Sequence, residues 1–190
     1  MAVRAVIFDC FGVLYGGSID ALLAMSPKDQ VQAVKDLNKQ SDYGFISGDE
    51  YVAGLAAALG KTPAEILEIL RQHHVRNEPL VEYVRSLHGS RRLGLLSNVS
   101  SGTMDRLFSP DERAELFDVV VLSYEESIAK PNPEIFTLIA ERLGVPAGEC
   151  VMVDDRAENC EGAEIAGMQS VQHTSNESTI AHLTRLFKEA

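Results

Sequence analysis

Four short apolar segments constrain the fold of this chain more than any other feature. They are residues 3–8 (VRAVIF), 93–96 (LGLL), 119–122 (VVVL) and 150–153 (CVMV). Runs of this length are typical of strands that are buried on both faces of a parallel sheet. Three of the four end directly in polar residues, which places polar side chains at the ends of buried strands.

Helical segments separate the predicted strands. Asn132 as N-cap, Pro133 at the first helical position and Gly144 as C-cap define one helix. Residues 156–168 and 178–190 predict two more. Because strands alternate with helices, the sequence predicts an α/β fold with a doubly wound (Rossmann-like) core built on a parallel sheet.

The segment between the first two predicted strands is too long for a simple crossover connection. It carries two capping boxes, at residues 47–50 and 62–65, and a further helix is expected from Ser26 and Pro27. We therefore expect a small all-helical cap domain inserted into the core. The predicted limits are residues 1–15 and 80–190 for the α/β core and residues 16–79 for the cap.

Charge and cysteine content exclude several classes of function. A formal net charge of −11 argues against nucleic acid or an anionic membrane as a partner. No run approaches about 18 apolar residues, so no membrane span is expected, and neither is a secretory signal. Cys10, Cys150 and Cys160 have no metal-binding spacing, which favours a reduced, cytoplasmic protein. The sequence carries no indication of oligomeric state.

Polar residues follow the predicted strands at Asp9, at Ser97 and Asn98, and at Asp154 and Asp155. Doubly wound sheets bind ligands at the carboxyl ends of their strands, so these side chains are candidates for one site. Two adjacent acids repel each other unless a cation is present. Structural alternatives stay open, because Asp9 alone also suits a strand-end turn. Ser97 and Asn98 also suit the N-cap of a helix that enters at residue 100.

Four motifs in this order, VIFDCFGVL, LGLLSN, KPNPEIF and VMVDDRAENCEGAEIAGM, resemble those of the haloacid dehalogenase-like hydrolase superfamily. The resemblance covers the whole chain, and the insertion resembles the small helical cap of that superfamily. The chain looks most similar to the phosphatases related to the amino-terminal domain of soluble epoxide hydrolase. The resemblance implies an enzyme that hydrolyses a phosphate monoester. Its substrate would be a small phosphorylated metabolite.

The resemblance also implies roles for individual residues. Asp9 would be the nucleophile, attacking phosphorus to form an aspartyl-phosphate that water later hydrolyses. Lys130 would neutralise charge on Asp9 and on the transferring group. Ser97 and the Asn98 backbone amide would donate hydrogen bonds to phosphate oxygens. Gly12 would let the chain turn away below the ligand.

Magnesium is the cofactor that the resemblance implies. Mg²⁺ would bridge Asp9 and a phosphate oxygen, with Asp155 as the second carboxylate ligand and the Phe11 carbonyl as a third ligand. Asp154 and Asn159 would lie beside the ion, as direct or as outer ligands.

Phe11 departs from the family pattern, because the phosphatases usually carry an aspartate there as general acid and base. Phenylalanine cannot transfer protons, and such catalysis is worth about 10²–10⁴ in rate. One explanation is a substrate with a good leaving group, such as a sugar 1-phosphate or an acyl phosphate. Another is that Asp20 or Tyr15 substitutes. Cys10 is interpreted as a packing residue and not as a second nucleophile.

A third explanation is that the reaction is not phosphate hydrolysis. The 2-haloacid dehalogenases of this superfamily also carry an aromatic residue at this position. Their nucleophilic aspartate, which Asp9 would match, acts without a metal ion. The dehalogenases usually have threonine where this chain has Val13, and a serine-rich fourth motif where it has Asp154 and Asp155. The pair of acids favours a bound metal ion and therefore phosphatase chemistry. A non-catalytic or regulatory member of the fold is the remaining alternative. The cap residues His73, His74 and Arg76 are interpreted as a solvent-exposed polar face.

Overall fold

A five-stranded parallel sheet forms the centre of the computed structural model, which describes residues 2–188. The strand order is β3-β2-β1-β4-β5, which confirms the predicted fold class. Four of the strands are those predicted from apolar segments; the fifth, β5, was not predicted. The bounds are β1 Ala5–Phe8, β2 Arg92–Ser97, β3 Val119–Leu122, β4 Cys150–Asp154 and β5 Gln169–Gln172.

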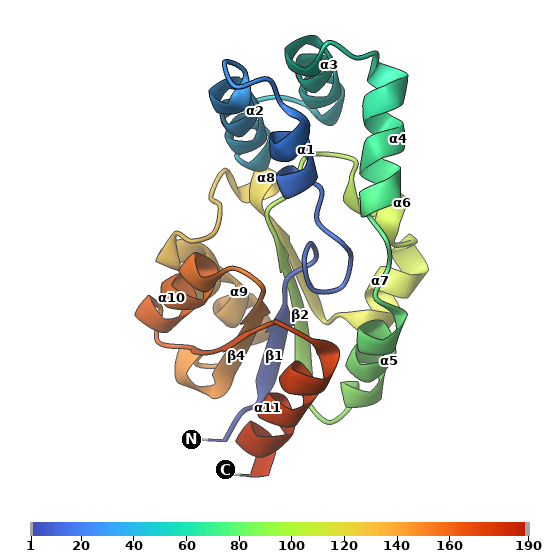
Figure 1. Ribbon diagram of the computed structural model, residues 1–190. Helices are drawn as coiled ribbons and strands as arrows, with labels where there is room; N and C mark the ends of the chain where they lie inside the picture. The colour runs from blue at the N-terminus through green and yellow to red at the C-terminus, as the bar shows by residue number, and fades with distance from the viewer. Residues whose placement is uncertain (1, 189–190) are drawn as a thin grey trace.

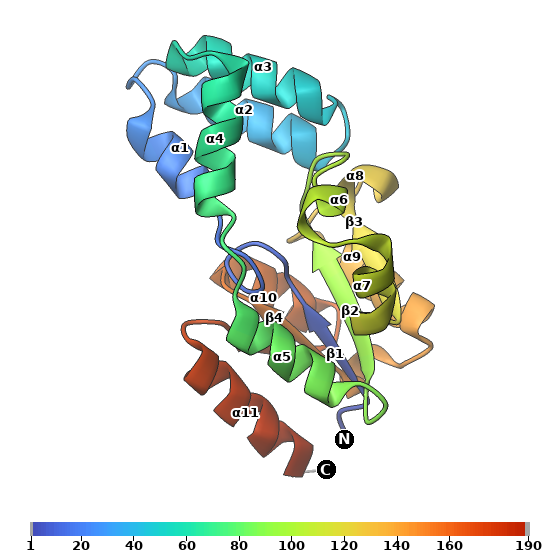
Figure 2. The same cartoon turned by 90° about the vertical axis from the view of Figure 1, so that its right-hand side faces the viewer.

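Helices cover both faces of the sheet (Figures 1 and 2). In β1, Val6 and Phe8 point to one face and Ala5 and Ile7 to the other, because side chains alternate along a strand. The first face is covered by α5 (Glu78–Leu87), α7 (Pro110–Leu116) and α11 (Asn176–Lys188). The second is covered by α9 (Pro133–Leu143) and α10 (Ala157–Ile165). The last two residues of the predicted tail helix lie outside the described part of the chain.

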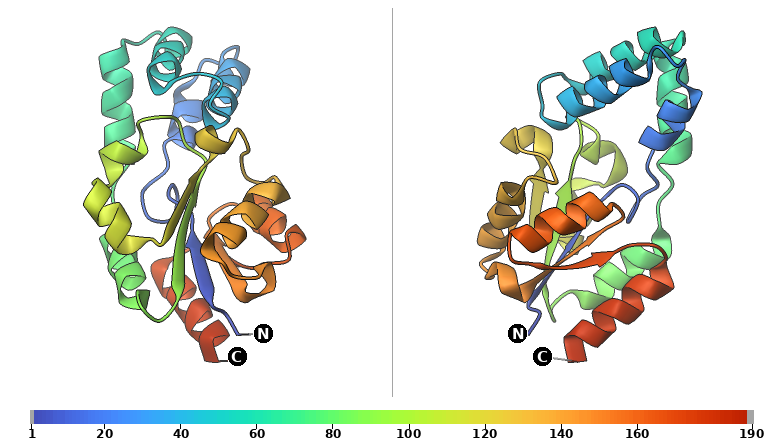
Figure 3. Two further views of the ribbon diagram at one scale, coloured as in Figure 1. Left: turned by 180° about the vertical axis from the view of Figure 1, so that it is seen from behind. Right: turned by 60° about the vertical axis from the view of Figure 1, so that its left-hand side comes forward.

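A separate group of helices follows β1 and lies beyond the carboxyl ends of the strands (Figure 3). It comprises α1 (Ile19–Met25), α2 (Val31–Asp42), α3 (Gly48–Leu59) and α4 (Pro63–His73). These helices share their own hydrophobic core around Leu22, Leu55 and Ile66. The predicted cap limit at residue 79 falls in the first turn of α5, whose apolar side packs on the sheet.

Local sequence signals account for several helix ends. Both capping boxes form as predicted and start α3 and α4. Asn132 caps α9, and Gly144 ends it in the left-handed conformation at φ 68°. The helix expected from Ser26 instead begins at Val31, because Ser26 is the C-cap of α1.

The remaining elements are short and connect the main ones. They are α6 (Met104–Leu107), α8 (Ser123–Glu126) and a 3₁₀ turn at Ala147–Glu149. Between residues 2 and 188 no helix has the length and apolar content needed to cross a membrane.

Candidate active site

Three carboxylates meet where β1 and β4 end. The Asp9 N–H donates to the Val153 carbonyl at 2.9 Å, which extends the pairing of β1 with β4 and fixes the backbone of Asp9. Asp154 is the last residue of β4, and Asp155 follows it. One oxygen from each of Asp9, Asp154 and Asp155 lies within 4.8 Å of the others. The structure thus brings together acids that are about 145 positions apart in the sequence, as expected for adjacent parallel strands.

Lys130 lies between two of these carboxylates. Its Nζ is 2.8 Å from Asp9 Oδ1 and 2.6 Å from Asp154 Oδ2, and its side chain is only 1% exposed. Burial lowers the pKa of Lys130, but the charges of Asp154 and Asp9 outweigh burial and raise it, so the ammonium stays protonated. Three carboxylates facing one ammonium leave an excess of negative charge at the site when all are ionised.

Burial and the excess negative charge both raise the pKa of Asp9, the candidate nucleophile. Burial, and then the neighbouring charge of Asp154, raise the pKa of Asp9 well above its ordinary value, while Lys130 opposes the rise. Burial and Asp154 also raise the pKa of Asp155. A divalent cation among these oxygens would reverse both effects, because it favours the ionised carboxylates.

Two residues hold Lys130 in place. The Asn98 side chain accepts from the Lys130 N–H and donates to the Lys130 carbonyl, both at 2.9 Å. Gly162 of α10 lies so close to the same loop that a Cβ would approach the Pro131 carbonyl oxygen to 2.3 Å. The glycine that weakens α10 as an isolated helix thus permits the close packing that supports Lys130. The side chain of Asn98 therefore positions the lysine, and only its backbone amide remains for phosphate.

Asp154 and Asp155 differ in how their carboxylates are occupied. Asp154 Oδ2 accepts from Lys130, and Oδ1 accepts from the Arg156 N–H at 3.0 Å and from Asn159 Nδ2 at 2.9 Å. Both oxygens of Asp154 are thus engaged. The Asp155 carboxylate accepts a hydrogen bond from its own backbone N–H and none from another residue in the range 2–188, which leaves it the freer carboxylate for a cation.

Gly12 makes room for Asp155. Its φ is +84°, and a Cβ at this position would lie 2.3 Å from the Asp155 carboxyl carbon. The Gly12 N–H donates to the Tyr15 carbonyl at 2.6 Å. This amide is therefore occupied within the loop, and the lack of a side chain at Gly12 leaves room for the Asp155 carboxylate.

Ser97 ends β2 with a hydroxyl that has no partner among residues 2–188, although it is fully buried. A buried polar atom without a hydrogen bond is costly, so it indicates a ligand atom that completes the site. The alternative role as an N-cap is wrong, because the next helix, α6, begins only at Met104, after Thr103.

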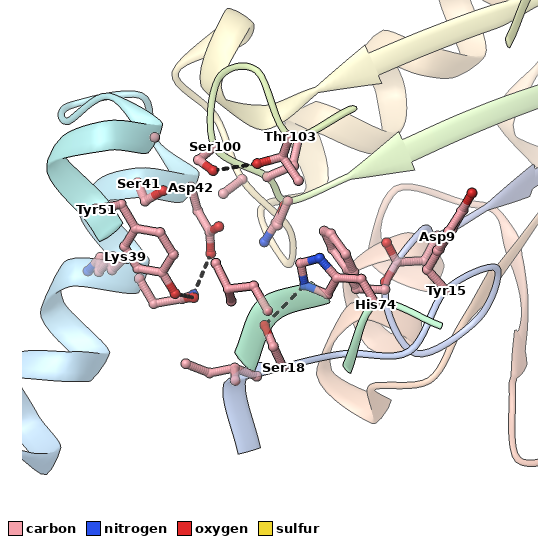
Figure 4. A pocket seen from close by; sticks show the side chains of 18 of the residues that line it. Asp9, Tyr15, Ser18, Lys39, Ser41, Asp42, Tyr51, His74, Ser100 and Thr103 are labelled. Atoms are coloured by element: carbon pink, nitrogen blue, oxygen red, sulfur yellow. Dashed lines mark hydrogen bonds between the residues drawn. The ribbon is translucent and has the colours of Figure 1, made fainter. Parts of the chain in front are cut away.

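A cavity of about 960 Å³ opens above this centre (Figure 4). Asp9, Lys130 and Asn98 contribute to its wall from the core, together with Phe11. The opposite wall comes from the helices beyond the sheet. Its side chains include Ser18, Asn38, Lys39, Asp42, Tyr51, Leu70 and His74.

The structure argues against both candidates for the missing proton donor, Asp20 and Tyr15. Asp20 is exposed and does not line the cavity. The Tyr15 hydroxyl donates to the Leu107 carbonyl at 2.5 Å and accepts from Arg76 at 3.1 Å, so it is fully engaged. Neither residue is placed to substitute for the acid that Phe11 replaces.

His74 differs from its expected position on a solvent-exposed face. Its ring lies 4.6 Å from that of Phe11, its Nε2 is 3.2 Å from Ser18 Oγ, and it lines the cavity. Burial lowers its pKa to about 4, so the imidazole is neutral at pH 7. The prediction was wrong because helix periodicity shows which residues share a face, not which face covers a neighbouring domain. His73 is exposed, as expected.

Cys10 is buried next to Asp9, and burial raises the pKa of its thiol. The thiol is therefore protonated and packs in the core, in agreement with the interpretation from sequence.

A buried lysine that contacts two aspartates thus lies beside a cavity at the carboxyl edge of a parallel sheet, which is where folds of this kind bind their ligands. A family model described as haloacid dehalogenase-like hydrolase matches residues 3–167. The chain belongs to this family, as its motifs predict, and is a hydrolase.

Two relatives carry phosphatase names. The chain is 31% identical over 114 residues to the fructose-1-phosphate phosphatase YqaB of Escherichia coli, a match that spans 60% of this chain and 61% of that protein. It is 26% identical over 188 residues to the sesquiterpene phosphatase astK of Aspergillus oryzae, across 96% of each chain. These relatives support the predicted phosphatase activity.

A solved structure has the same fold. It is that of a haloacid dehalogenase family enzyme from Bacteroides thetaiotaomicron, an aspartate-to-alanine mutant in complex with magnesium and inorganic phosphate. The TM-score is 0.77 at 22% identity, and the match covers 96% of this chain and 99% of that chain.

Proposed function

We propose that this hydrolase is a Mg²⁺-dependent phosphatase that releases phosphate from a small phosphorylated metabolite through an aspartyl-phosphate on Asp9. The observation that carries the proposal is the contact of Lys130 with both Asp9 and Asp154, beside an Asp155 carboxylate that accepts no hydrogen bond from another residue in the range 2–188. This arrangement suits a nucleophile, a fixed cation and a metal ligand at one cavity.

The contacts of Asp9 favour one of its oxygens as the nucleophile. Oδ1 accepts from Lys130 at 2.8 Å and from the Cys10 N–H at 2.6 Å. Oδ2 has no donor within the described residues, so its lone pairs remain for phosphorus. Oδ2 forms a bond to phosphorus, and the bond from phosphorus to the ester oxygen breaks.

Charge on the transferring group is stabilised by groups already in place. Lys130 offsets one negative charge, and the Ser97 hydroxyl and the Asn98 backbone amide donate to phosphate oxygens. Water then attacks phosphorus, the bond to Asp9 breaks, and phosphate leaves with the carboxylate restored. Because neither Asp20 nor Tyr15 can protonate the departing oxygen, a good leaving group such as a sugar 1-phosphate suits this site.

Carboxylate and carbonyl oxygens are the ligands that Mg²⁺ prefers, so the residues fit this ion. Asp9, Asp155 and the Phe11 carbonyl would hold it, and Asp154 would orient Lys130 and Asn159. When bound, Mg²⁺ supplies positive charge that offsets the carboxylates and polarises the phosphoryl group.

The proposal includes the domain division and the cellular setting. Residues 16–79 would form the cap that closes over the core, and residues 1–15 and 80–190 the core itself. The three cysteines are free and buried, which supports a reducing compartment such as the cytoplasm.

A paired release assay tests this function. Free phosphate is measured from p-nitrophenyl phosphate and from a sugar 1-phosphate, and free halide from 2-chloropropionate, each with and without Mg²⁺. We expect Mg²⁺-dependent phosphate release that disappears in Asp9→Asn, a variant of nearly unchanged shape. Metal-independent halide release would instead establish dehalogenase activity. The aromatic residue Phe11 is the observation that favours this alternative.

A further inference from the structure

We propose that Asp42, oriented by Asn38 and Tyr51, binds a hydroxyl group of the substrate's leaving group, so that the enzyme selects polyhydroxylated, carbohydrate-like phosphate esters. This inference rests on the proposed phosphatase function and assigns the leaving-group side of the same cavity.

A short chain of hydrogen bonds fixes Asp42. The Tyr51 hydroxyl donates to Asn38 Oδ1 at 3.0 Å, and Asn38 Nδ2 donates to Asp42 Oδ2 at 2.9 Å. The other oxygen, Asp42 Oδ1, accepts no hydrogen bond from residues 2–188, and Asp42 lines the cavity (Figure 4). One carboxylate oxygen is thus anchored and the other is available to a ligand.

The position of Asp42 is unfavourable for folding. It is the last residue of α2, where the helix dipole disfavours negative charge. Burial raises its pKa to about 7, although the charges of Lys130 and Arg156 oppose the rise. A residue that breaks local rules without a structural benefit is expected to serve function. Asp42 lines the same cavity as Asp9 and Lys130.

The charges around the cavity discriminate between kinds of leaving group. Lys35, Lys39 and Arg71 line it from the helices beyond the sheet, and Arg156 lines it from the core. Arg71 and Arg156 are paired with Glu68 and Glu158, but Lys35 and Lys39 would repel an ammonium group, which is the other natural partner of a carboxylate. A hydroxyl carries no charge and donates a hydrogen bond to Asp42.

An apolar leaving group fits this wall poorly. It would remove the Asp42 Oδ1 atom from water without providing a donor, and an unsatisfied buried polar group costs free energy. The apolar members of the wall, such as Leu70 and Val52, suit the less polar faces of a sugar ring.

The experiment measures kcat and KM on four esters with Mg²⁺ present: a hexose 1-phosphate, a hexose 6-phosphate, farnesyl monophosphate and p-nitrophenyl phosphate. The variants are Asp42→Asn and Asp42→Leu. Asp36→Asn is a matched control, because Asp36 lies exposed on the same helix and accepts from Gln32 Nε2, four residues earlier, at 2.9 Å. Circular dichroism verifies that each variant is folded.

We expect the wild type to prefer a hexose phosphate. Asp42→Asn should lower kcat/KM on that ester by about 10–100-fold, mainly through KM, as for a lost hydrogen bond to a charged group. It should hardly change p-nitrophenyl phosphate, whose leaving group offers no such hydroxyl. Asp42→Leu should shift preference toward farnesyl monophosphate, and Asp36→Asn should change nothing.

Two results overturn the inference and differ from each other. If the wild type releases phosphate and Asp42→Asn has the same selectivity among the four esters, the proposed role of Asp42 is refuted. The phosphatase function is not affected by that result. A folded wild type that releases no phosphate from any ester refutes the proposed phosphatase function, and the inference with it.

Discussion

Replacing Lys130 by methionine tests the electrostatic account of the site. Lys130 is the buried cation within hydrogen-bonding distance of both Asp9 and Asp154, and methionine keeps much of its volume. Removing one partner of a buried ion pair leaves uncompensated charge and typically costs about 3–5 kcal/mol. We therefore expect Lys130→Met to lower the free energy of unfolding by about this amount at pH 8 without Mg²⁺.

The loss should depend on pH with a defined sign. Without the ammonium, the pKa of Asp9 in the folded state rises further above its unfolded value of about 3.9. The folded state then binds a proton more readily than the unfolded state, so lowering the pH favours folding. The deficit of Lys130→Met relative to wild type should therefore shrink between pH 8 and pH 5. Mg²⁺ should also restore part of it, because it binds only the folded site.

Urea unfolding followed by circular dichroism, with EDTA or with MgCl₂, measures these quantities. Lys28→Met is the control, because Lys28 is exposed and does not line the cavity. A deficit below about 1 kcal/mol at pH 8, or one that is the same at both pH values, would refute the reasoning, since surface charges contribute about that much.

Three further substitutions test individual assignments. Asp155→Asn should abolish the response of phosphate release to Mg²⁺, and a wild-type metal titration would remove Asp155 from the metal site. Phe11→Asp should raise turnover of an unactivated alkyl phosphate, by up to about 10²-fold, since it supplies a proton donor; a folded variant that is no faster would contradict this. Asp42 has a folded-state pKa of about 7 against an unfolded value of about 3.9, so it lowers stability progressively as the pH rises between these two values. Asp42→Asn should therefore raise Tm at pH 8 more than at pH 5, and thermal melts showing the reverse order would contradict the assignment.

The sequence was sufficient where a residue acts through local chemistry. The apolar strands, both capping boxes and the Asn132 cap are signals read from a few neighbouring residues, and they appear as predicted. Asp9 and Asp154 converge because the neighbouring parallel strands β1 and β4 align their carboxyl ends. Strand β5 was missed because it is an edge strand with a polar sequence, QSVQ.

The cavity wall beyond the sheet could not be predicted in the same way. Asn38 and Asp42 lie four residues apart on α2, which buries only Val34 and Ser41, so their pattern is that of a solvated helix face. The position of the helix over the sheet, which turns that face into a cavity wall, depends on tertiary packing. The two hydrogen bonds from Asn98 to the backbone of Lys130 likewise join residues 32 positions apart.

The most direct test of the account is to trap the phosphorylated enzyme. Wild-type protein is mixed with excess sugar 1-phosphate and Mg²⁺, quenched in acid within the first turnover, digested, and analysed by mass spectrometry. The account predicts one added phosphoryl group on the peptide that contains Asp9, and none in Asp9→Asn. Phosphate release at full rate with the phosphoryl group on another residue would contradict Asp9 as the nucleophile.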